Sequence, residues 1–419
     1  MNKKILKSTL LDEKCIVCTH ESGLKIFIIE KPEFSSSHAV FGTRYGSIDT
    51  KFAKSGENMT EVPNGIAHFL EHKLFESEDG DAFSKYARTG ASANAYTSFD
   101  RTCYLFGCSD KFMENLDILL NFVSSPFFTP ETVEKEQGII GQEIRMYDDS
   151  PGWRVMFNAL GAMYHNHPVK IDIAGTINSI AEIDDKLLYE CYNTFYNPAN
   201  MFLCIAGNVS GDKILQKVEK FFENAKSVTV SRGEISEPEN IATGYVEQKM
   251  AVSMPLFCIG IKDKVAAERT VKEIAVNEIL AAMISGKASA FYNSLLENNL
   301  LSGDLDAEYF YGRGYSALMF EGESRNPKEV LSALKNHICE LSENGIEKEA
   351  FLGAKRKVYG RAVRMFNNVE DMVSVLVDSA MNECEPFEFS EELNLVTEYD
   401  IKQRIDRIDI NNICISVVL

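Results

Sequence analysis

The sequence predicts an α+β fold made of two homologous α/β domains, each with a mainly antiparallel sheet flanked by helices. The chain has 419 residues, which exceeds one ordinary hydrophobic core and fits two domains of about 200 residues each. Strand-like and helix-like patterns follow one another in a similar order in both halves, which indicates a distant duplication. Residues 227–244 are rich in Ser, Glu, Pro and Gly and have no hydrophobic period. We therefore expect a first domain at 1–228, a linker at 229–244 and a second domain at 245–419.

The first domain is expected to begin with strands and to continue with alternating helices and strands. β-Branched and aromatic residues recur in a two-residue rhythm in the strand patterns, whereas apolar residues recur three and four positions apart in the helices. Ile66, Phe69 and Leu70, for example, share one face of a helix that begins at Gly65. The predicted strands cover residues 23–29, 37–48, 91–107 and 201–207, and the further helices cover residues 110–123, 131–147, 178–196 and 212–225.

The second domain shows similar patterns after the linker. Strand-like stretches at 245–261 and 305–322 are each followed by two helical patterns. The predicted helices cover residues 266–284, 288–299, 327–342 and 347–364. This order supports a repeated architecture rather than a literal sequence repeat.

The composition restricts the class of function and the cellular location. A formal net charge of −19 makes nucleic acid and anionic membrane surfaces poor partners. The acidity is explained by a solvated surface, with a preference for basic peptides as the alternative. The start of the chain lacks the apolar core of an export signal, and no run of about 18 apolar residues occurs. We therefore expect the ten cysteines to be free thiols in a cytoplasmic protein without a membrane span.

One helix carries a pattern typical of a catalytic metal site. His68 and His72 are four residues apart, so their imidazoles lie one turn apart on the same face and can share one tetrahedral ion. Glu71 lies three residues after His68 and can reach a water on that ion. This HxxEH arrangement is the metallopeptidase HExxH motif in reverse order. Zinc with three protein ligands and an open fourth position, beside a carboxylate that takes a proton, can hydrolyse a carbonyl compound.

The third ligand is expected on the helix predicted at 131–147. Glu136 and Glu143 are two turns apart, so both lie on nearly the same face. One of them can bind the metal while the other accepts a hydrogen bond from a ligating histidine.

The alternative to a metal site is a surface helix with two solvated histidines. The His-x-x-acid-His pattern arises by chance roughly 0.02 times in a chain of this composition. The apolar neighbours Ile66, Phe69 and Leu70 also count against full solvation of this helix. A buried His–His–Glu cluster without a metal would leave polar groups with few partners. These points favour zinc.

The same residues resemble the M16 family of zinc peptidases, which includes pitrilysin, insulin-degrading enzyme and the mitochondrial processing peptidase. The resemblance covers nearly the whole chain and is strongest with the short bacterial two-domain members of the YmfH-like type. It rests on HxxEH followed some 70 residues later by ExxxxxxE, and on several shorter motifs. These motifs are Gly46-Ser-Ile-Asp49, Gly65 to Glu76, Ala91-Ser-Ala-Asn-Ala-Tyr-Thr97, His167-Pro168 with Gly175, and Tyr196-Asn-Pro-Ala-Asn-Met201.

The resemblance implies a fold of the M16/LuxS-like metallohydrolase type and a role for each residue of the motif. It assigns His68, His72 and Glu143 as ligands of one Zn²⁺ per chain, Glu71 as the base and Glu136 as the acid that supports the site. The gap between His72 and Glu143 is somewhat shorter than is usual in the family. The second domain is then expected to lack a metal.

Residues Ala93, Asn94 and Ala95 are expected to bind the substrate. Short polar residues at 91–97 suit an edge strand, which can add an extended peptide by backbone pairing. An ordinary sheet edge would have a similar pattern. The family resemblance implies the substrate-binding role, because the corresponding strand holds extended peptides beside the zinc.

The chain departs from the family in its second half. Active M16 enzymes also use an Arg, followed about six residues later by a Tyr, to hold the substrate and stabilise the oxyanion. The matching stretch at 295–303 contains neither residue. Arg313 and Tyr315 lie nearby, but we interpret them as structural residues on a strand, where residues two apart face the same side.

This departure predicts a zinc endopeptidase subunit that completes its closed chamber with a second chain. The expected partner is a homologous M16 chain that lacks HxxEH but supplies the Arg/Tyr pair. Two alternatives remain open: a homodimer in which Arg313 and Tyr315 take that role, and an inactive M16-like scaffold or peptide-binding subunit. The intact set of His68, Glu71, His72 and Glu143 argues against the inactive scaffold.

Overall fold

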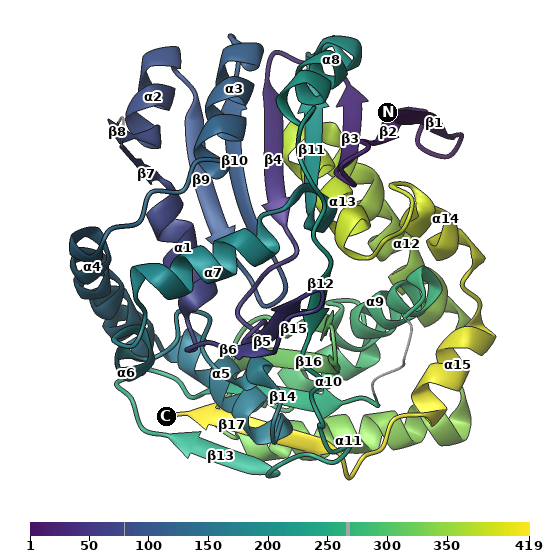
Figure 1. The fold of residues 1–419 in the computed structure, drawn as a ribbon. Coiled ribbons are helices and arrows are strands. Elements are labelled where there is room, and N and C mark those ends of the chain that lie inside the picture. Colours follow the sequence, from purple (N-terminus) through teal and green to yellow (C-terminus); the bar gives the residue numbers. More distant parts are fainter. Residues whose placement is uncertain (79, 265–268) are drawn as a thin grey trace. The chain divides into compact units, whose positions relative to one another are not determined.

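The computed structural model describes residues 1–78, 80–264 and 269–419, which form two compact units (Figure 1). Unit 1 comprises Met1–Ile144, Asp172–Glu234 and Arg364–Phe387. Unit 2 comprises Arg145–Ile171, Ile235–Val363 and Glu388–Leu419. The α+β class predicted from the sequence is confirmed, since each unit combines a largely antiparallel sheet with helices.

The sheet of unit 1 has seven strands in the order β1-β2-β3-β11-β4-β10-β9. Its neighbours are antiparallel except β3 and β11, which are parallel. Strand β9 therefore lies at the edge of the sheet. The strands are β1 (Asn2–Ser8), β2 (Glu13–Thr19), β3 (Lys25–Glu30), β4 (Ser37–Thr43), β9 (Ser92–Thr97), β10 (Thr102–Cys108) and β11 (Met201–Gly207).

Eight helices of unit 1 surround this sheet within the described residues. They are α1 (Ile66–Leu74), α2 (Ala82–Thr89), α3 (Phe112–Val123), α4 (Pro130–Asp148), α6 (Ile177–Ile180), α7 (Asp185–Phe195), α8 (Gly211–Phe221) and α13 (Val369–Met381). The last residues of α4 belong to unit 2. The short strands β5 (Lys51–Lys54), β6 (Thr60–Glu61), β7 (Glu76–Ser77), β8 (Gly80–Asp81) and β12 (Val230–Arg232) form two small additional sheets.

Unit 2 contains a five-stranded sheet in the order β13-β17-β14-β16-β15. Only β13 and β17 are parallel. The strands are β13 (Tyr245–Gln248), β14 (Leu256–Lys262), β15 (Asp306–Gly312), β16 (Tyr315–Glu323) and β17 (Ile413–Val418). The helices are α5 (Pro151–Met163), α9 (Val271–Ser285), α10 (Ala290–Glu297), α11 (Pro327–Asn344), α12 (Lys348–Arg364), α14 (Glu388–Leu395) and α15 (Glu398–Asp406).

The two sheets have the same topology. If the strands of unit 2 are numbered along the chain, their spatial order is 1-5-2-4-3, and β3, β11, β4, β10 and β9 of unit 1 follow the same order. The single parallel pair also occupies the same place, β3–β11 in unit 1 and β13–β17 in unit 2. The predicted duplication is therefore visible in strand order and direction. By this correspondence, β15 is the counterpart of the edge strand β9, and α9 is the counterpart of α1.

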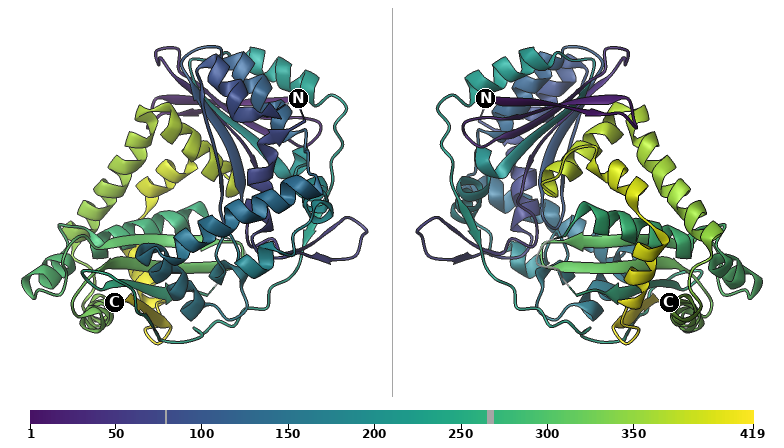
Figure 2. Two further views of the ribbon diagram at one scale, coloured as in Figure 1. Left: turned by 90° about the vertical axis from the view of Figure 1, so that its left-hand side faces the viewer. Right: turned by 90° about the vertical axis from the view of Figure 1, so that its right-hand side faces the viewer.

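The units differ from the predicted domains because the halves of the chain exchange a helix. Helix α13 comes from the C-terminal half, yet it lies against the sheet of unit 1 (Figure 2). Its residues Met372 and Leu376 belong to one buried cluster with Phe27, Val40 and Phe202 of that sheet. Helix α5 comes from the N-terminal half and packs on β14 and β17 of unit 2. A side chain at Gly260 of β14 would meet the Met163 sulfur at 2.4 Å, so this close approach requires glycine. Both helices bury an apolar face. The predicted domains 1–228 and 245–419 are each continuous in sequence, so they do not include a helix from the other half of the chain.

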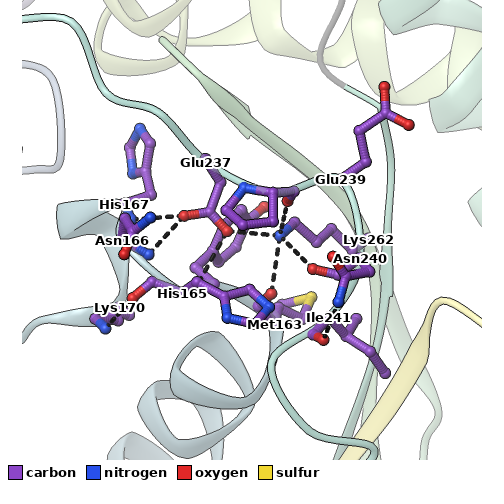
Figure 3. Close-up of polar contacts among 12 residues, drawn as sticks. Met163, His165, Asn166, His167, Lys170, Glu237, Glu239, Asn240, Ile241 and Lys262 are labelled. Carbon is purple, nitrogen blue, oxygen red and sulfur yellow. Dashed lines mark hydrogen bonds and ion pairs between the residues drawn. The ribbon is translucent and has the colours of Figure 1, made fainter.

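The predicted linker at 229–244 is more ordered than its composition indicates. Residues 230–232 form β12, which pairs with β5. The Glu237 carboxylate accepts hydrogen bonds from the N–H groups of His165, Asn166 and His167 at 2.6–2.9 Å, and from Lys262 Nζ at 2.7 Å (Figure 3). Burial alone would raise the pKa of Glu237, but these donors lower it to about 2. This carboxylate therefore fixes the connection to unit 2.

Other differences between prediction and structure concern elements in both halves of the chain. The predicted helix at 266–284 corresponds to α9, and its residues 266–268 lie outside the described residues. The strand-like stretch at 305–322 forms a hairpin of β15 and β16. Helices α5, α13, α14 and α15 were not predicted.

One helical stretch among the described residues, 271–297, meets the length and hydropathy of a membrane span. It comprises α9 and α10, and 61% of its apolar window is buried. Ile279, Leu280 and Ile284 belong to the core of unit 2. This is weak evidence for a span, because the core helix of a water-soluble protein has the same properties.

Candidate metal centre

Helix α1 is largely buried and places His68 and His72 beside each other on one face. Its first residue follows Gly65, whose φ of 90° is a left-handed conformation that favours glycine. A side chain there would also meet the Ala174 carbonyl oxygen at 2.4 Å. Ile66, Phe69, Leu70 and Leu74 are buried, which fixes the orientation of the helix. The rings of His68 and His72 consequently lie with centroids 4.6 Å apart.

Helix α4 brings a carboxylate to both imidazoles. Glu143 Oε1 lies 3.7 Å from His68 Nε2, and Glu143 Oε2 lies 3.5 Å from His72 Nε2. His68, His72 and Glu143 each offer one possible ligand atom, and these three atoms all lie within 4.8 Å of one another. In a tetrahedral zinc site, with ligands about 2.0–2.2 Å from the ion, donor atoms are about 3.3–3.5 Å apart. The two measured distances are long for hydrogen bonds and close to those of ligands around one ion.

Glu136 contacts the other nitrogen of His72. The His72 Nδ1–H donates to Glu136 Oε1 at 3.0 Å, which directs Nε2 of the same ring toward Glu143. Burial lowers the pKa of His72, but the Glu136 hydrogen bond and nearby carboxylates raise it overall. Burial acts on Glu136 in the opposite sense, and the contact with His72 lowers its pKa overall. The structure thus separates the positions of the two glutamates, which sequence spacing alone left open.

His68 is buried and has the protonation that a metal ligand needs. Burial lowers its pKa to about 4, so the imidazole is neutral at physiological pH. Its Nδ1 atom has no hydrogen-bond partner among the described residues. Two imidazoles and a carboxylate form a donor set that suits zinc.

Glu71 lies on the same helix beside the end of the edge strand. Its side chain accepts a hydrogen bond from Thr97 Oγ1 at 2.8 Å. The residue is 8% exposed, and burial raises the pKa of its carboxyl above the ordinary value. The HxxEH motif predicts the role of Glu71, whereas no motif points to Thr97, although Thr97 ends the strand pattern at 91–97.

The free edge of β9 can be assigned from its pairing with β10. At the turn after β9, the Ser98 N–H donates to the Arg101 carbonyl at 2.8 Å. Hydrogen-bonded and non-hydrogen-bonded pairs alternate along an antiparallel ladder, so Ala93, Ala95 and Thr97 form the non-hydrogen-bonded pairs with β10. Their N–H and C=O groups therefore point to the free edge.

Asn94 belongs to the opposite face of β9. It is exposed, whereas Ala93 and Ala95 are half-buried on the face that also carries Thr97. The Asn94 side-chain oxygen accepts the N–H of Ala95 at 2.9 Å. An edge-facing donor of β9 is thus covered by a side chain from the same strand.

Arg313 and Tyr315 lie in unit 2 and have structural contacts. Arg313 is in the turn between β15 and β16, not on a strand as predicted, and its carbonyl accepts a hydrogen bond from His167 Nε2 at 3.0 Å. Tyr315 is 2% exposed, with its ring 5.3 Å from that of His167. The stretch 295–303 comprises the end of α10 and the following loop.

The fold and this site define a protein of two duplicated α/β units with a His–His–Glu group on one of them. The chain belongs to peptidase family M16, as a short two-domain member. Residues 57–177 match the family model "Insulinase (Peptidase family M16)", and residues 182–358 match "Peptidase M16 inactive domain".

Known relatives match this chain in sequence and in structure over nearly its full length. The uncharacterized zinc protease YmfH of Bacillus subtilis is 40% identical over 413 residues, which cover 96% of this chain and 94% of YmfH. A crystal structure from Alicyclobacillus acidocaldarius, described as that of an M16-like peptidase, has a TM-score of 0.93 and 32% identity, and the match covers 100% of this chain and 99% of that chain. Pitrilysin has a TM-score of 0.79 at 16% identity, and the match covers 100% of this chain and 46% of pitrilysin. The pitrilysin match shows the fold.

Proposed function

We propose that this chain is a zinc-dependent endopeptidase subunit in which His68, His72 and Glu143 hold one zinc ion. The observation that carries the proposal is the convergence of two imidazole Nε2 atoms on one carboxylate, at 3.7 and 3.5 Å. The names of relatives such as the zinc protease YmfH support the same metal. Among the described residues, no second group of this kind was found.

The residues around this set have separate roles in the proposed reaction. Zinc held by His68, His72 and Glu143 would supply a Lewis acid for the scissile carbonyl and for the attacking water. Glu71 accepts the proton of the attacking water and passes it to the leaving amine. Glu136 holds His72 by its Nδ1–H, which fixes the tautomer and orientation of that ligand.

The edge of β9 is the proposed substrate-binding surface. Backbone groups of Ala93 and Ala95 point to this edge and can pair with an extended peptide. Asn94 covers the Ala95 N–H, so a peptide must displace its side chain to pair there. Since this recognition uses backbone groups, it selects unfolded or short extended peptides rather than one sequence.

A homologous chain is the proposed partner, and together the two chains form the closed chamber. The second half of this chain matches a family model named as the inactive domain, and residues 295–303 lack the Arg/Tyr pair. In the homodimer alternative, Tyr315 would have to leave a position where it is 2% exposed. The inactive-scaffold alternative does not explain why the HxxEH motif is present together with a convergent His68–His72–Glu143 group.

The function is tested with the chain purified from its native cell together with its bound partners. Zinc analysis and cleavage of extended fluorogenic peptides are measured on the same sample. The proposal expects near-stoichiometric zinc and hydrolysis that a chelator abolishes. Bound zinc without hydrolysis in the assembled complex would favour the scaffold.

A further inference from the structure

We propose that Thr97 is a positioning residue that fixes the base Glu71 in register with a peptide bound along β9. The inference rests on the proposed function and adds a residue to it. Thr97 is the last residue of β9, and its hydroxyl donates to Glu71 Oε2 at 2.8 Å. A single side chain thus joins the substrate strand to the helix that carries the metal ligands.

The direction of this hydrogen bond is set by a second threonine. Thr102 Oγ1 donates to the Tyr45 carbonyl at 2.8 Å, and Thr102 is fully buried. The Thr102 hydroxyl proton is therefore used in this bond and is not donated to Thr97, although the two hydroxyl oxygens lie 3.4 Å apart. The Thr97 proton has two acceptors in reach, and the charged carboxylate is the nearer one. Hydrogen bonds to a carboxylate are also the stronger kind.

The bond restricts what the Glu71 carboxylate can do. With Oε2 held by Thr97, the base that accepts a proton from water is Oε1. The backbone N–H of Thr97 points to the free edge of β9, where a paired peptide would lie. The Thr97 hydroxyl therefore orients the carboxylate.

The position of Thr97 on the edge gives the register. Edge-facing backbone groups recur at every second residue, Ala93, Ala95 and Thr97, which is a spacing of about 6.8 Å. A paired peptide can move along this edge only in steps of that length. A peptide held at Ala93 and Ala95 consequently reaches Glu71 at a fixed spacing, because Thr97 is the next edge position and is bonded to the base.

The kinetic test uses Thr97→Val, which keeps the shape of the side chain, and Thr97→Ser, which keeps the hydroxyl. Both are assayed in the full chain with its partner. We expect Thr97→Val to lower kcat about tenfold or more with KM within about twofold, since the loss falls on the transition state. Thr97→Ser should restore most of kcat, and zinc content should be unchanged in both variants. A purely structural role would give equal losses for the two variants.

A second readout requires no activity. A double-mutant cycle combines Thr97→Val with Glu71→Ala and measures urea unfolding of the metal-free chain. We expect Thr97→Val to raise the unfolding equilibrium constant about tenfold when Glu71 is present, and much less when Glu71 is alanine. Additive effects, or an unchanged kcat in Thr97→Val, would overturn the inference. Absence of cleavage by the wild-type assembly would instead overturn the proposed function.

Discussion

The Nδ1–H of His72 donates to Glu136 across 3.0 Å, while Nε2 of the same ring lies 3.5 Å from Glu143. One imidazole therefore joins the two glutamates of α4, with one glutamate at each nitrogen. The two contacts have different lengths because Glu136 forms a hydrogen bond and Glu143 faces the proposed metal position. This difference leads to separate expectations for the two glutamates.

Removal of a proposed ligand should remove zinc. Glu143→Gln and His72→Ala are each expected to reduce the zinc content of the purified chain strongly. Glu136→Gln should weaken zinc affinity by about 10–100-fold, since it removes only the support of a ligand. The measurement is metal analysis and competition with a chelator. His337→Ala is the control, because its ring stacks on Phe291 in unit 2. Equal or greater zinc loss with Glu136→Gln would mean that the two roles are exchanged.

The turn before α1 should tolerate no side chain. Gly65→Ala places a methyl group against the Ala174 carbonyl oxygen and forces a left-handed φ on alanine. We expect a loss of more than about 2 kcal/mol in unfolding free energy, together with weaker zinc binding. Gly56→Ala is the matched control, since Gly56 has a φ of 83° but open space around its Cα. It should lose only the cost of the backbone conformation, about 1–2 kcal/mol, with unchanged zinc affinity. Similar results for both variants would contradict the steric account.

The Glu237 cluster should make stability depend on acid pH. The folded-state pKa of about 2 lies below the ordinary value of 4.5, so the carboxylate contributes stability above about pH 4.5 and loses it as the pH falls toward 2. Glu237→Gln is therefore expected to cost about 2 kcal/mol at pH 7 and progressively less at lower pH. Denaturant unfolding at several pH values measures this difference. Glu239→Gln is the control, because Glu239 forms an exposed pair with Lys264. A pH-independent difference for Glu237→Gln would contradict the ionic anchor.

The isolated chain should bind zinc but cleave peptide slowly. A missing oxyanion donor costs about 10²–10³ in rate, and residues 295–303 supply neither member of the Arg/Tyr pair. Addition of a homologous M16 chain that carries the pair should restore cleavage in a fluorogenic peptide assay. Robust activity of the chain alone, lost in Tyr315→Phe, would show that a homodimer completes the site.

Local sequence patterns predicted the parts of the site that depend on one helix. The spacing of His68 and His72 fixes their common face because a helix has a constant period, and the structure shows their rings 4.6 Å apart. The seven-residue spacing likewise placed Glu136 and Glu143 on one face of α4. It could not assign each glutamate to a nitrogen, because that depends on how α1 and α4 pack. The family resemblance supplied an assignment, which stays a prediction until the ligands are tested.

Contacts distant in sequence explain what the patterns missed. The amphipathic sequences of α5 and α13 show that each helix buries a face, but not which sheet receives it, so the exchanged helices were not predicted. The local sequence places Glu237 in a polar linker, because its partners at 165–167 lie about 70 residues earlier in the chain. Thr97 was recognised only as a strand residue, because its contact with Glu71 depends on the position of β9 beside α1.

The most direct test of the account compares wild type with Glu71→Gln in the complex purified through this chain from its native cell. Glutamine keeps the size of the side chain but cannot accept the proton of water. The account predicts that both complexes contain the same amount of zinc, and that peptide hydrolysis by Glu71→Gln is at least about 100-fold slower. Hydrolysis at a similar rate by both complexes, or no hydrolysis by a zinc-loaded wild-type complex, would contradict it.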